Sequence, residues 1–236
     1  MQYQVQNKTI GLIGGIGWAS AAEYYRLINE LVLKRTGISH SARVVLLSLD
    51  QHDFTSRAAE ADPQAIHDFL VMQANKLQAA GADFFIFCAN GAHRFVPAIL
   101  PRLPLPFVSI VDATVSQVQA SGIQKVGLLG VRQTMSGNFY HEKLSAAGIT
   151  TLTPDATTQD SIHDIIYSEL IHNRLTEKSR ALFLDYIQAL ADQGAEGVIL
   201  GCTEIPSLIS QEDVSMPVFN TTSIHCQAIV DFAFAS

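Results

Sequence analysis

The sequence predicts an α/β protein with two pseudo-symmetric lobes, each a parallel sheet flanked by helices, and with the active site in the cleft between the lobes. Short apolar runs alternate with longer stretches of helical spacing, which is typical of parallel strands joined by covering helices. The 236 residues are 48% hydrophobic and 16% charged, a balance that fits strands buried on both faces. The third observation is an internal repeat, which relates one half of the chain to the other.

Strands and helices are expected in alternation along the first half of the chain. We expect strands at residues 9–13, 42–49, 82–88 and 107–110, helices at 19–34 and 62–80, and a last helix at 223–234. Pro63 stands near the start of one predicted helix and Gly81 follows its end, which are the positions these residues favour at helix boundaries.

The internal repeat has three landmarks that recur in the same order. Lys8–Gly14 resembles Lys125–Gly130, Gly81–Asn90 resembles Gly194–Thr203, and Leu105–Ser109 resembles Met216–Asn220. A duplication of this kind predicts a first lobe of residues 1–113 plus 220–236 and a second lobe of residues 114–219. The alternative is that any parallel α/β protein shows similar strand entries.

Composition argues against several classes of partner. The chain has 15 basic and 22 acidic residues, a net charge of −7, whereas nucleic-acid binding depends on clustered cations. The apolar runs are too short to span a bilayer, and residues 1–9 are polar, unlike a signal peptide. Three cysteines indicate a reduced, cytoplasmic setting rather than a disulfide framework. No histidine and cysteine spacing indicates a metal site, so we expect no metal.

Ligands of parallel α/β sheets bind at the carboxyl ends of the strands, so the residues that follow each strand are the candidate site. In the loop Gly14–Gly17, the backbone at Gly15 and Ile16 is placed to contact an anion at a helix N-terminus. A tight turn explains the same glycines equally well. Arg57, in the loop expected after the second strand, is either a ligand for a side-chain carboxylate or a solvated surface residue.

Cys202 is the main catalytic candidate of the second lobe. A cysteine at a strand end that faces a helix N-terminus has its thiolate stabilised by the helix dipole. Thr203 adds a hydroxyl donor beside it. Cys226, in the last predicted helix, is expected to fill the core, and His93 is expected to cap or pack the helix that follows it.

The repeat fixes which residue of the first lobe corresponds to Cys202. That residue is Ala89, whereas Cys88 corresponds to Gly201. A shift of one residue in an extended strand turns a side chain to the opposite face. We therefore expect Cys88 to face a core and Ala89 to face the cleft. Asn90 then corresponds to Thr203, and both are candidate donors to a substrate carboxylate.

Several motifs, taken together and in order, resemble the aspartate/glutamate racemase family. They are Lys8–Trp18, Tyr24–Asn29, Asn90–His93, Gly201–Pro206, and Pro217–Thr222 with His225. The resemblance covers nearly the whole chain. Glu204 after Cys-Thr is similar to the aspartate racemase branch, since glutamate racemases usually carry histidine there.

The resemblance implies racemisation of a small acidic amino acid without a cofactor. Family members place two cysteines on opposite faces of the substrate Cα, and Cys202 matches the second of them. Donors around the substrate carboxylate would stabilise the developing carbanion. By position these donors are Asn90, Gly91, Thr134 and Thr203, with Glu204 also in the binding set. The resemblance also implies a homodimer, for which the helix faces with Tyr24, Tyr25 and Leu31 are candidates.

The chain departs from the family pattern at three positions. Where the family usually reads Cys-Asn-Thr-Ala-His, this chain has Ala89 in the cysteine position and Gly91 in the threonine position, and Asn220 replaces an aspartate. Either the loop distorts so that Cys88 reaches the cleft, or Cys202 works alone and the enzyme is asymmetric between enantiomers. Two alternatives remain: a single-cysteine decarboxylase or isomerase of a dicarboxylic acid, and a binding protein for acidic amino acids that has lost catalysis.

Overall fold

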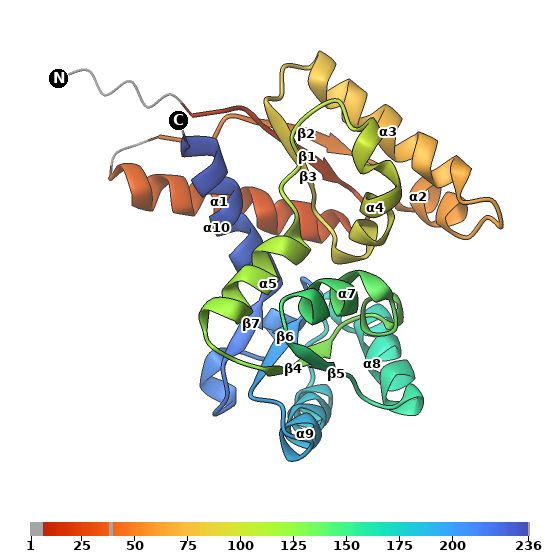
Figure 1. Ribbon diagram of the computed structural model, residues 1–236, viewed down its shortest axis with the longest axis vertical. Helices are drawn as coiled ribbons and strands as arrows, with labels where there is room; N and C mark the ends of the chain where they lie inside the picture. The colour runs from red at the N-terminus through yellow and green to blue at the C-terminus, as the bar shows by residue number, and fades with distance from the viewer. Residues whose placement is uncertain (1–6, 38–39, 236) are drawn as a thin grey trace. The chain divides into compact units, whose positions relative to one another are not determined.

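The computed structural model describes residues 7–37 and 40–235, in which strands and helices alternate (Figure 1). The strands are β1 (Ile10–Gly14), β2 (Val44–Ser48), β3 (Phe84–Phe87), β4 (Lys125–Leu129), β5 (Thr150–Leu152), β6 (Gly197–Leu200) and β7 (Val218–Asn220). The helices are α1 (Trp18–Thr36), α2 (Gln51–Ala58), α3 (Gln64–Ala79), α4 (Val96–Ile99), α5 (Ile110–Ala120), α6 (Arg132–Met135), α7 (Asn138–Ala146), α8 (Ala156–Ser168), α9 (Glu177–Asp192) and α10 (Thr221–Phe234). Short 3-10 helices include η1 (Asn90–Phe95) and η4 (Ile205–Ser207).

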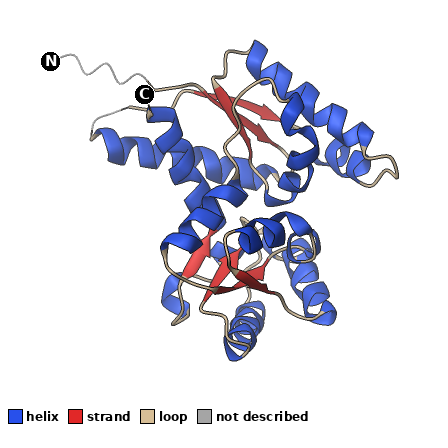
Figure 2. Cartoon of the chain, viewed as in Figure 1, coloured by secondary structure: helices blue, strands red, loops and turns tan. Residues whose placement is uncertain are grey.

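The chain forms two compact units, each built on its own parallel sheet (Figure 2). Unit 1 takes in the described residues of Met1–Ser109 and His225–Ser236, and unit 2 is Ile110–Ile224. The strand order is β2-β1-β3 in unit 1 and β5-β4-β6-β7 in unit 2, and all pairs are parallel. The predicted α/β class with two helix-flanked parallel sheets is confirmed.

The sheet of unit 1 is covered on both faces, because β1 alternates its side chains between two apolar clusters. Ile10 and Leu12 enter one of them, and Ile13 enters the other. The α1 cluster consists of Ile10, Leu12, Ala21, Tyr24, Ile28, Val32, Phe84, Ile86, Cys88, Cys226, Ile229, Val230 and Ala233. The α3 cluster consists of Ile13, Phe54, Ile66, Leu70, Ala74, Leu77, Ala82, Phe85, Phe87, Ala92 and Ile99.

Unit 2 repeats this arrangement around its central strands. Val198 and Leu200 of β6 pack with α8 and α9, whereas Ile199 packs on the opposite face with α5 and α7. Gly127 lets α9 approach β4 closely, since a Cβ there would lie 2.9 Å from Cδ1 of Leu190. Gly11 has the same role in unit 1, where a Cβ would lie 2.9 Å from Cδ1 of Leu77.

The strand predicted at residues 107–110 is wrong. Phe107 makes only an isolated parallel bridge to Phe85, and Ile110 already begins α5. Pro104 and Pro106 precede the bridge and have no backbone N–H, so this segment cannot extend the hydrogen-bond ladder in that direction. Pairing is therefore confined to a single position before the helix begins.

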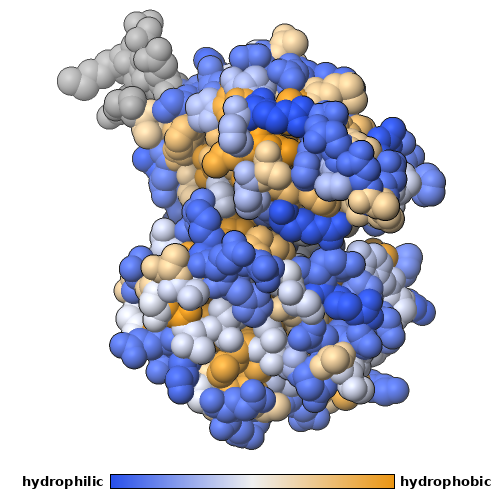
Figure 3. Space-filling model, turned by 45° about the vertical axis from the view of Figure 1, so that its right-hand side comes forward, coloured by the Kyte–Doolittle hydropathy of each residue, from blue (hydrophilic) through white to orange (hydrophobic). Residues whose placement is uncertain are grey.

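Hydrophobic residues reach the surface between polar ones on the face shown in Figure 3, as they do on most folded proteins. Among the described residues, no helix combines the length and the apolar character that a membrane span needs.

Candidate functional site

Cys202 lies at the carboxyl end of β6, beyond the buried Gly201. The chain then turns through η4, a 3-10 helix of three residues, and no α-helix lies between β6 and β7. The helix expected directly after Cys202 is therefore wrong, because only this short turn follows it there, and a single turn has no macrodipole of that strength.

Glu204 provides the side chain that is hydrogen-bonded to the Cys202 thiol. The Cys202 Sγ donates to Glu204 Oε2 over 2.8 Å, and the Thr203 hydroxyl donates to the same oxygen over 2.7 Å. Burial raises the pKa of the Cys202 thiol well above its usual value, and the negative charge of Glu204 raises it further. The Cys202 thiol thus lies in direct hydrogen-bond contact with the Glu204 side chain. The Thr203 hydroxyl proton is committed to this carboxylate.

Thr134 lies on α6, directly beyond β4. Its Cγ2 is 2.9 Å from the position that a Cβ on Gly201 would occupy and 3.1 Å from that of a Cβ on Gly130. The two glycines thus allow Thr134 to pack against the ends of β4 and β6, next to Cys202. The Thr134 hydroxyl is fully buried and has no hydrogen-bond partner among the described residues.

The end of β7 completes the carboxyl edge of unit 2. The Thr221 hydroxyl donates to the Leu200 carbonyl over 2.8 Å, which fixes the start of α10 beside the end of β6. Asn220 Oδ1 accepts from the backbone N–H groups of Thr222 and Ser223, each over 3.1 Å, so Asn220 caps α10. Sequence reasoning did not select Thr222, whose hydroxyl is also buried without a partner among the described residues.

Cys88 and Ala89 lie at the carboxyl edge of unit 1 and face different clusters. Cys88 is buried in the α1 cluster together with Cys226, whereas the partly buried Ala89 packs against the α3 cluster. Burial raises the pKa of the Cys88 thiol well above its usual value. The Cys88 carbonyl accepts from the Ser20 hydroxyl over 2.5 Å, which ties this segment to α1.

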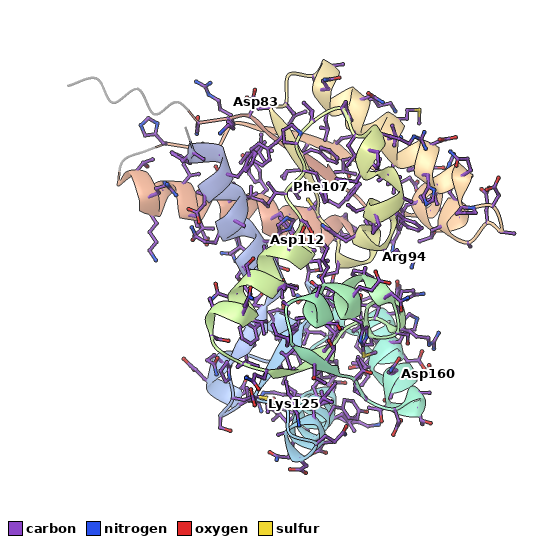
Figure 4. The ribbon with its side chains drawn as sticks, in the orientation of Figure 1. Asp83, Arg94, Phe107, Asp112, Lys125 and Asp160 are labelled. Atoms are coloured by element: carbon purple, nitrogen blue, oxygen red, sulfur yellow. The ribbon has the colours of Figure 1, made fainter. Side chains whose placement is uncertain are left out.

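Asn90 and His93 are buried in η1, while Gly91 between them borders open space. A Cβ on Gly91 would meet no atom within 4 Å. His93 Nδ1 lies 3.0 Å from the Ala89 carbonyl. The His93 ring packs 5.4 Å, centroid to centroid, from Phe107, which lies beside the sheet of unit 1 (Figure 4). His93 therefore packs within this unit.

The loop after β1 is a tight turn. Gly15 has a φ of +82°, and a Cβ there would lie 2.0 Å from the Leu49 carbonyl oxygen. The Leu49 N–H donates to the Gly14 carbonyl over 3.0 Å. Ile16 is partly buried against the α3 cluster. The glycine at position 15 is thus explained by its left-handed backbone conformation and by close packing, without a ligand.

Arg57 lies in the last turn of α2, and the loop predicted for it is wrong. A helix that the sequence analysis did not predict, α2, starts at Gln51 and is capped by Asp50. The Arg57 guanidinium forms an ion pair with Asp53 at 3.0 Å and stacks 4.6 Å from the centroid of the Phe69 ring.

The structure places the predicted site residues at the carboxyl ends of strands in their respective units. Thr134, Thr203, Glu204 and Cys202 gather in unit 2, and Gly15, Ile16, Ala89, Asn90 and Gly91 lie in unit 1. Arg57 lies further along α2. No group of three or more potential metal ligands occurs in the described parts of the chain.

Comparisons with known proteins identify related sequences and folds. The family model described as Asp/Glu/hydantoin racemase matches residues 13–229. A Yersinia pestis protein assigned to the Asp/Glu racemases is 41% identical, with a TM-score of 0.90 over 97% of this chain and 100% of that one. An aspartate racemase homologue from Pyrococcus horikoshii is 29% identical, with a TM-score of 0.83 over 96% of this chain and 99% of its own. The broad specificity amino-acid racemase RacX of Bacillus subtilis is 22% identical over 94% of this chain and 96% of its own length.

Proposed function

The chain belongs to the Asp/Glu/hydantoin racemase family, and from that premise we propose that it is an amino-acid racemase that needs no cofactor and acts on aspartate and/or glutamate. The observation that carries this proposal is the hydrogen bond between the Cys202 thiol and the Glu204 carboxylate, 2.8 Å long, at the carboxyl end of a parallel strand. It is a nucleophile-and-base pair of the kind that proton abstraction requires.

In the proposed reaction, Glu204 accepts the Cys202 thiol proton as the substrate binds. The thiolate then takes the α-proton, so the Cα–H bond breaks and its electron pair stays on the substrate as a carbanion conjugated with the carboxylate. Hydrogen-bond donors around that carboxylate stabilise the charge. A proton from water reaches the other face of Cα, and the resulting hydroxide takes the proton from Glu204, which restores the resting state.

The reaction is asymmetric in this proposal. Ala89 corresponds to Cys202 in the internal repeat and carries no thiol. Cys88 is buried in the α1 cluster, and burial raises its pKa. A buried thiol in apolar surroundings is unreactive. Only the enantiomer whose α-proton faces Cys202 then exchanges efficiently.

Residues at strand ends are the candidates for substrate binding. In unit 2 we assign Thr134 and Thr203 to this role, and the Thr203 hydroxyl would have to leave Glu204 to donate to a substrate. In unit 1 the candidates at strand ends are Gly15, Ile16, Asn90 and Gly91. Arg57 would bind a side-chain carboxylate only by sharing its guanidinium with Asp53.

Deuterium exchange tests the function and separates it from the alternatives. Each enantiomer of aspartate and glutamate is incubated with the protein in D₂O, and loss of the α-proton and chiral inversion are followed. Exchange that Cys202→Ser abolishes supports a thiol-based racemase. Loss of CO₂ or isomerisation of a dicarboxylic acid would point to the single-cysteine decarboxylase or isomerase. Tight binding without exchange would point to a binding protein.

The proposed assembly is a homodimer formed through α1. Of the predicted interface residues, Tyr24 is buried and Leu31 packs on the α1 cluster. Tyr25, which is 52% exposed, remains as a candidate for the interface. Trp18 and Leu33 on the same helix are also exposed. The three free cysteines support a reducing compartment such as the cytoplasm.

A further inference from the structure

Three buried side-chain oxygens have no hydrogen-bond partner in the described parts of the chain: the hydroxyls of Thr134, Thr151 and Thr222. A buried polar group without a partner is unfavourable by about 1–3 kcal/mol, and such groups are rare in folded proteins. Each of these hydroxyls therefore calls for an explanation. Two of them lie at the carboxyl edge of unit 2, and the third does not.

Thr134 and Thr222 lie on either side of the strand that carries Cys202. In the order β5-β4-β6-β7, Thr134 follows β4 and Thr222 follows β7, so they flank β6. Thr134 packs against Gly201, the residue before Cys202. Thr222 is next to Thr221, whose hydroxyl binds the Leu200 carbonyl. Thr134 and Thr222 are 0% and 2% exposed, so bulk solvent does not satisfy them.

The surroundings of Thr222 favour an anion. Thr222 lies in the first turn of α10, a helix of 14 residues whose N-terminus carries partial positive charge. Asn220 occupies two of the first N–H groups of this helix, but the Thr222 hydroxyl remains a donor. A carboxylate accepts several hydrogen bonds and so can satisfy more than one hydroxyl at once.

We propose that the hydroxyls of Thr134 and Thr222 together bind one carboxylate group of the substrate, which makes Thr222 a substrate-binding residue. This inference rests on the proposed function for the identity of the ligand, an amino acid. It deepens that function by naming the chemical group that the edge beside Cys202 recognises. Two neutral hydroxyls bind the group, and only that of Thr222 lies at the N-terminus of a long helix.

Thr151 supplies a matched control for the experiment. It lies in the middle of β5, paired with Val126, away from the carboxyl edge. Its hydroxyl has the same lack of a partner, and the replacement of threonine by valine has the same size in each case. Removing an unpaired buried hydroxyl is neutral or stabilising in the free protein. We therefore expect Thr134→Val, Thr151→Val and Thr222→Val all to melt at or above the wild-type temperature.

Binding is measured by calorimetry with succinate, which has carboxylates but no amine and no α-proton to exchange, and with L- and D-aspartate on Cys202→Ala. We expect Thr222→Val and Thr134→Val to weaken binding about 10-fold or more, as loss of a charge-assisted hydrogen bond does, and Thr151→Val to bind as the wild type does. The inference is overturned if Thr222→Val binds all three ligands with unchanged affinity, if Thr151→Val is weakened as much, or if the parent proteins bind none of them.

Exchange assays in D₂O then identify the carboxylate and separate the two proposals. If Thr222→Val raises KM for aspartate and for alanine alike, the bound group is the α-carboxylate, and if it raises KM for aspartate alone, it is the side-chain carboxylate. Binding that depends on Thr222 in a protein without exchange would reject the racemase and keep the carboxylate site. Exchange that proceeds unchanged in Thr222→Val would keep the racemase and reject the carboxylate site.

Discussion

Cys88 and Ala89 are adjacent in sequence but pack against opposite clusters of unit 1, Cys88 with α1 and α10 and Ala89 with the α3 cluster. One position of register therefore decides whether this unit presents a thiol at its carboxyl edge. The thiol of Cys88 is directed into the core, and its pKa is raised by burial. The methyl group of Ala89 occupies the position that corresponds to Cys202 in the internal repeat.

Restoring a thiol at position 89 should make the reaction more symmetric. We expect Ala89→Cys to raise exchange of the enantiomer that the parent protein exchanges slowly by about 10-fold or more, because a positioned acid or base contributes roughly 10²–10⁴-fold. The ratio of kcat/KM for the two enantiomers in D₂O measures this. Cys88→Ala is the control and should leave the ratio unchanged. A folded Ala89→Cys protein with an unaltered ratio would contradict the assignment.

Glu204 should act as the base for Cys202. We expect Glu204→Gln to lower exchange by about 100-fold or more, because the amide keeps the size of the side chain but cannot take the thiol proton. The same change should lower the pKa of Cys202, since the carboxylate charge is one of the causes that raise it.

In Glu204→Gln, the reactivity of the Cys202 thiol should therefore rise while the rate of α-proton exchange falls. Alkylation of Cys202 by iodoacetamide, followed against pH, should begin at lower pH than in the parent, while α-proton exchange falls. Glu212→Gln, at an exposed position in η5, Gln211–Asp213, is the matched control and should change neither. If alkylation and exchange fell together, Glu204 would be supporting the local structure and not the proton transfer.

Much of the fold follows from local sequence signals, and the exceptions depend on tertiary structure. Gly81 and Gly194, paired by the repeat, both adopt positive φ values, +86° and +95°, just before a strand. Such positions are visible in sequence because few other residues tolerate them. The strand expected near Phe107 was wrong, because apolar composition does not reveal how far a ladder extends beside prolines.

The chemistry of the site was only partly predictable, because it too depends on contacts that form in the tertiary structure. Cys202 was selected from its place after a strand, but the sequence did not show that a short turn follows it or that Glu204 would reach back to its sulfur. The partners of Arg57 on α2 and α3 depend on helix packing. The hydroxyl of Thr222 has no local signal, since only the packed structure shows that it is buried and unpaired.

His225 should make the stability of unit 1 depend on pH. Its Nδ1 lies 2.8 Å from the Tyr24 hydroxyl and its Nε2 lies 3.0 Å from the Val108 carbonyl, so Nε2–H donates and Nδ1 accepts in a neutral ring. Burial, together with the neighbouring His93, lowers the pKa of His225 to about 3. The unfolded chain, with a pKa near 6.5, then binds a proton that the folded unit excludes.

The contribution of His225 is present above pH 6.5 and is lost as the pH falls from there toward 3. The free energy of unfolding should decline by up to about 1.4 kcal/mol per pH unit from this group. Urea unfolding at several pH values measures the slope, which should be shallower in His225→Gln although that variant is less stable at pH 7. Tyr24→Phe removes the donor to Nδ1 and should cost about 1–3 kcal/mol at pH 7. Tyr25→Phe, at an exposed position, should cost less than about 0.5 kcal/mol. An unchanged slope in His225→Gln would assign the acid sensitivity to other groups.

Gly15 should be required by close packing as well as by its backbone conformation, and Gly81 allows the two effects to be separated. Both have positive φ, +82° and +86°, so alanine at either position is strained by about 1–2 kcal/mol. At Gly81 an added Cβ meets nothing within 4 Å, whereas at Gly15 it would lie 2.0 Å from the Leu49 carbonyl oxygen and 2.4 Å from the Leu49 nitrogen. We therefore expect Gly15→Ala to destabilise the protein at least twice as much as Gly81→Ala in urea unfolding, because the segment after β2 must move away from the loop after β1. Equal losses would mean that this segment shifts without cost, and close packing would then no longer explain the glycine.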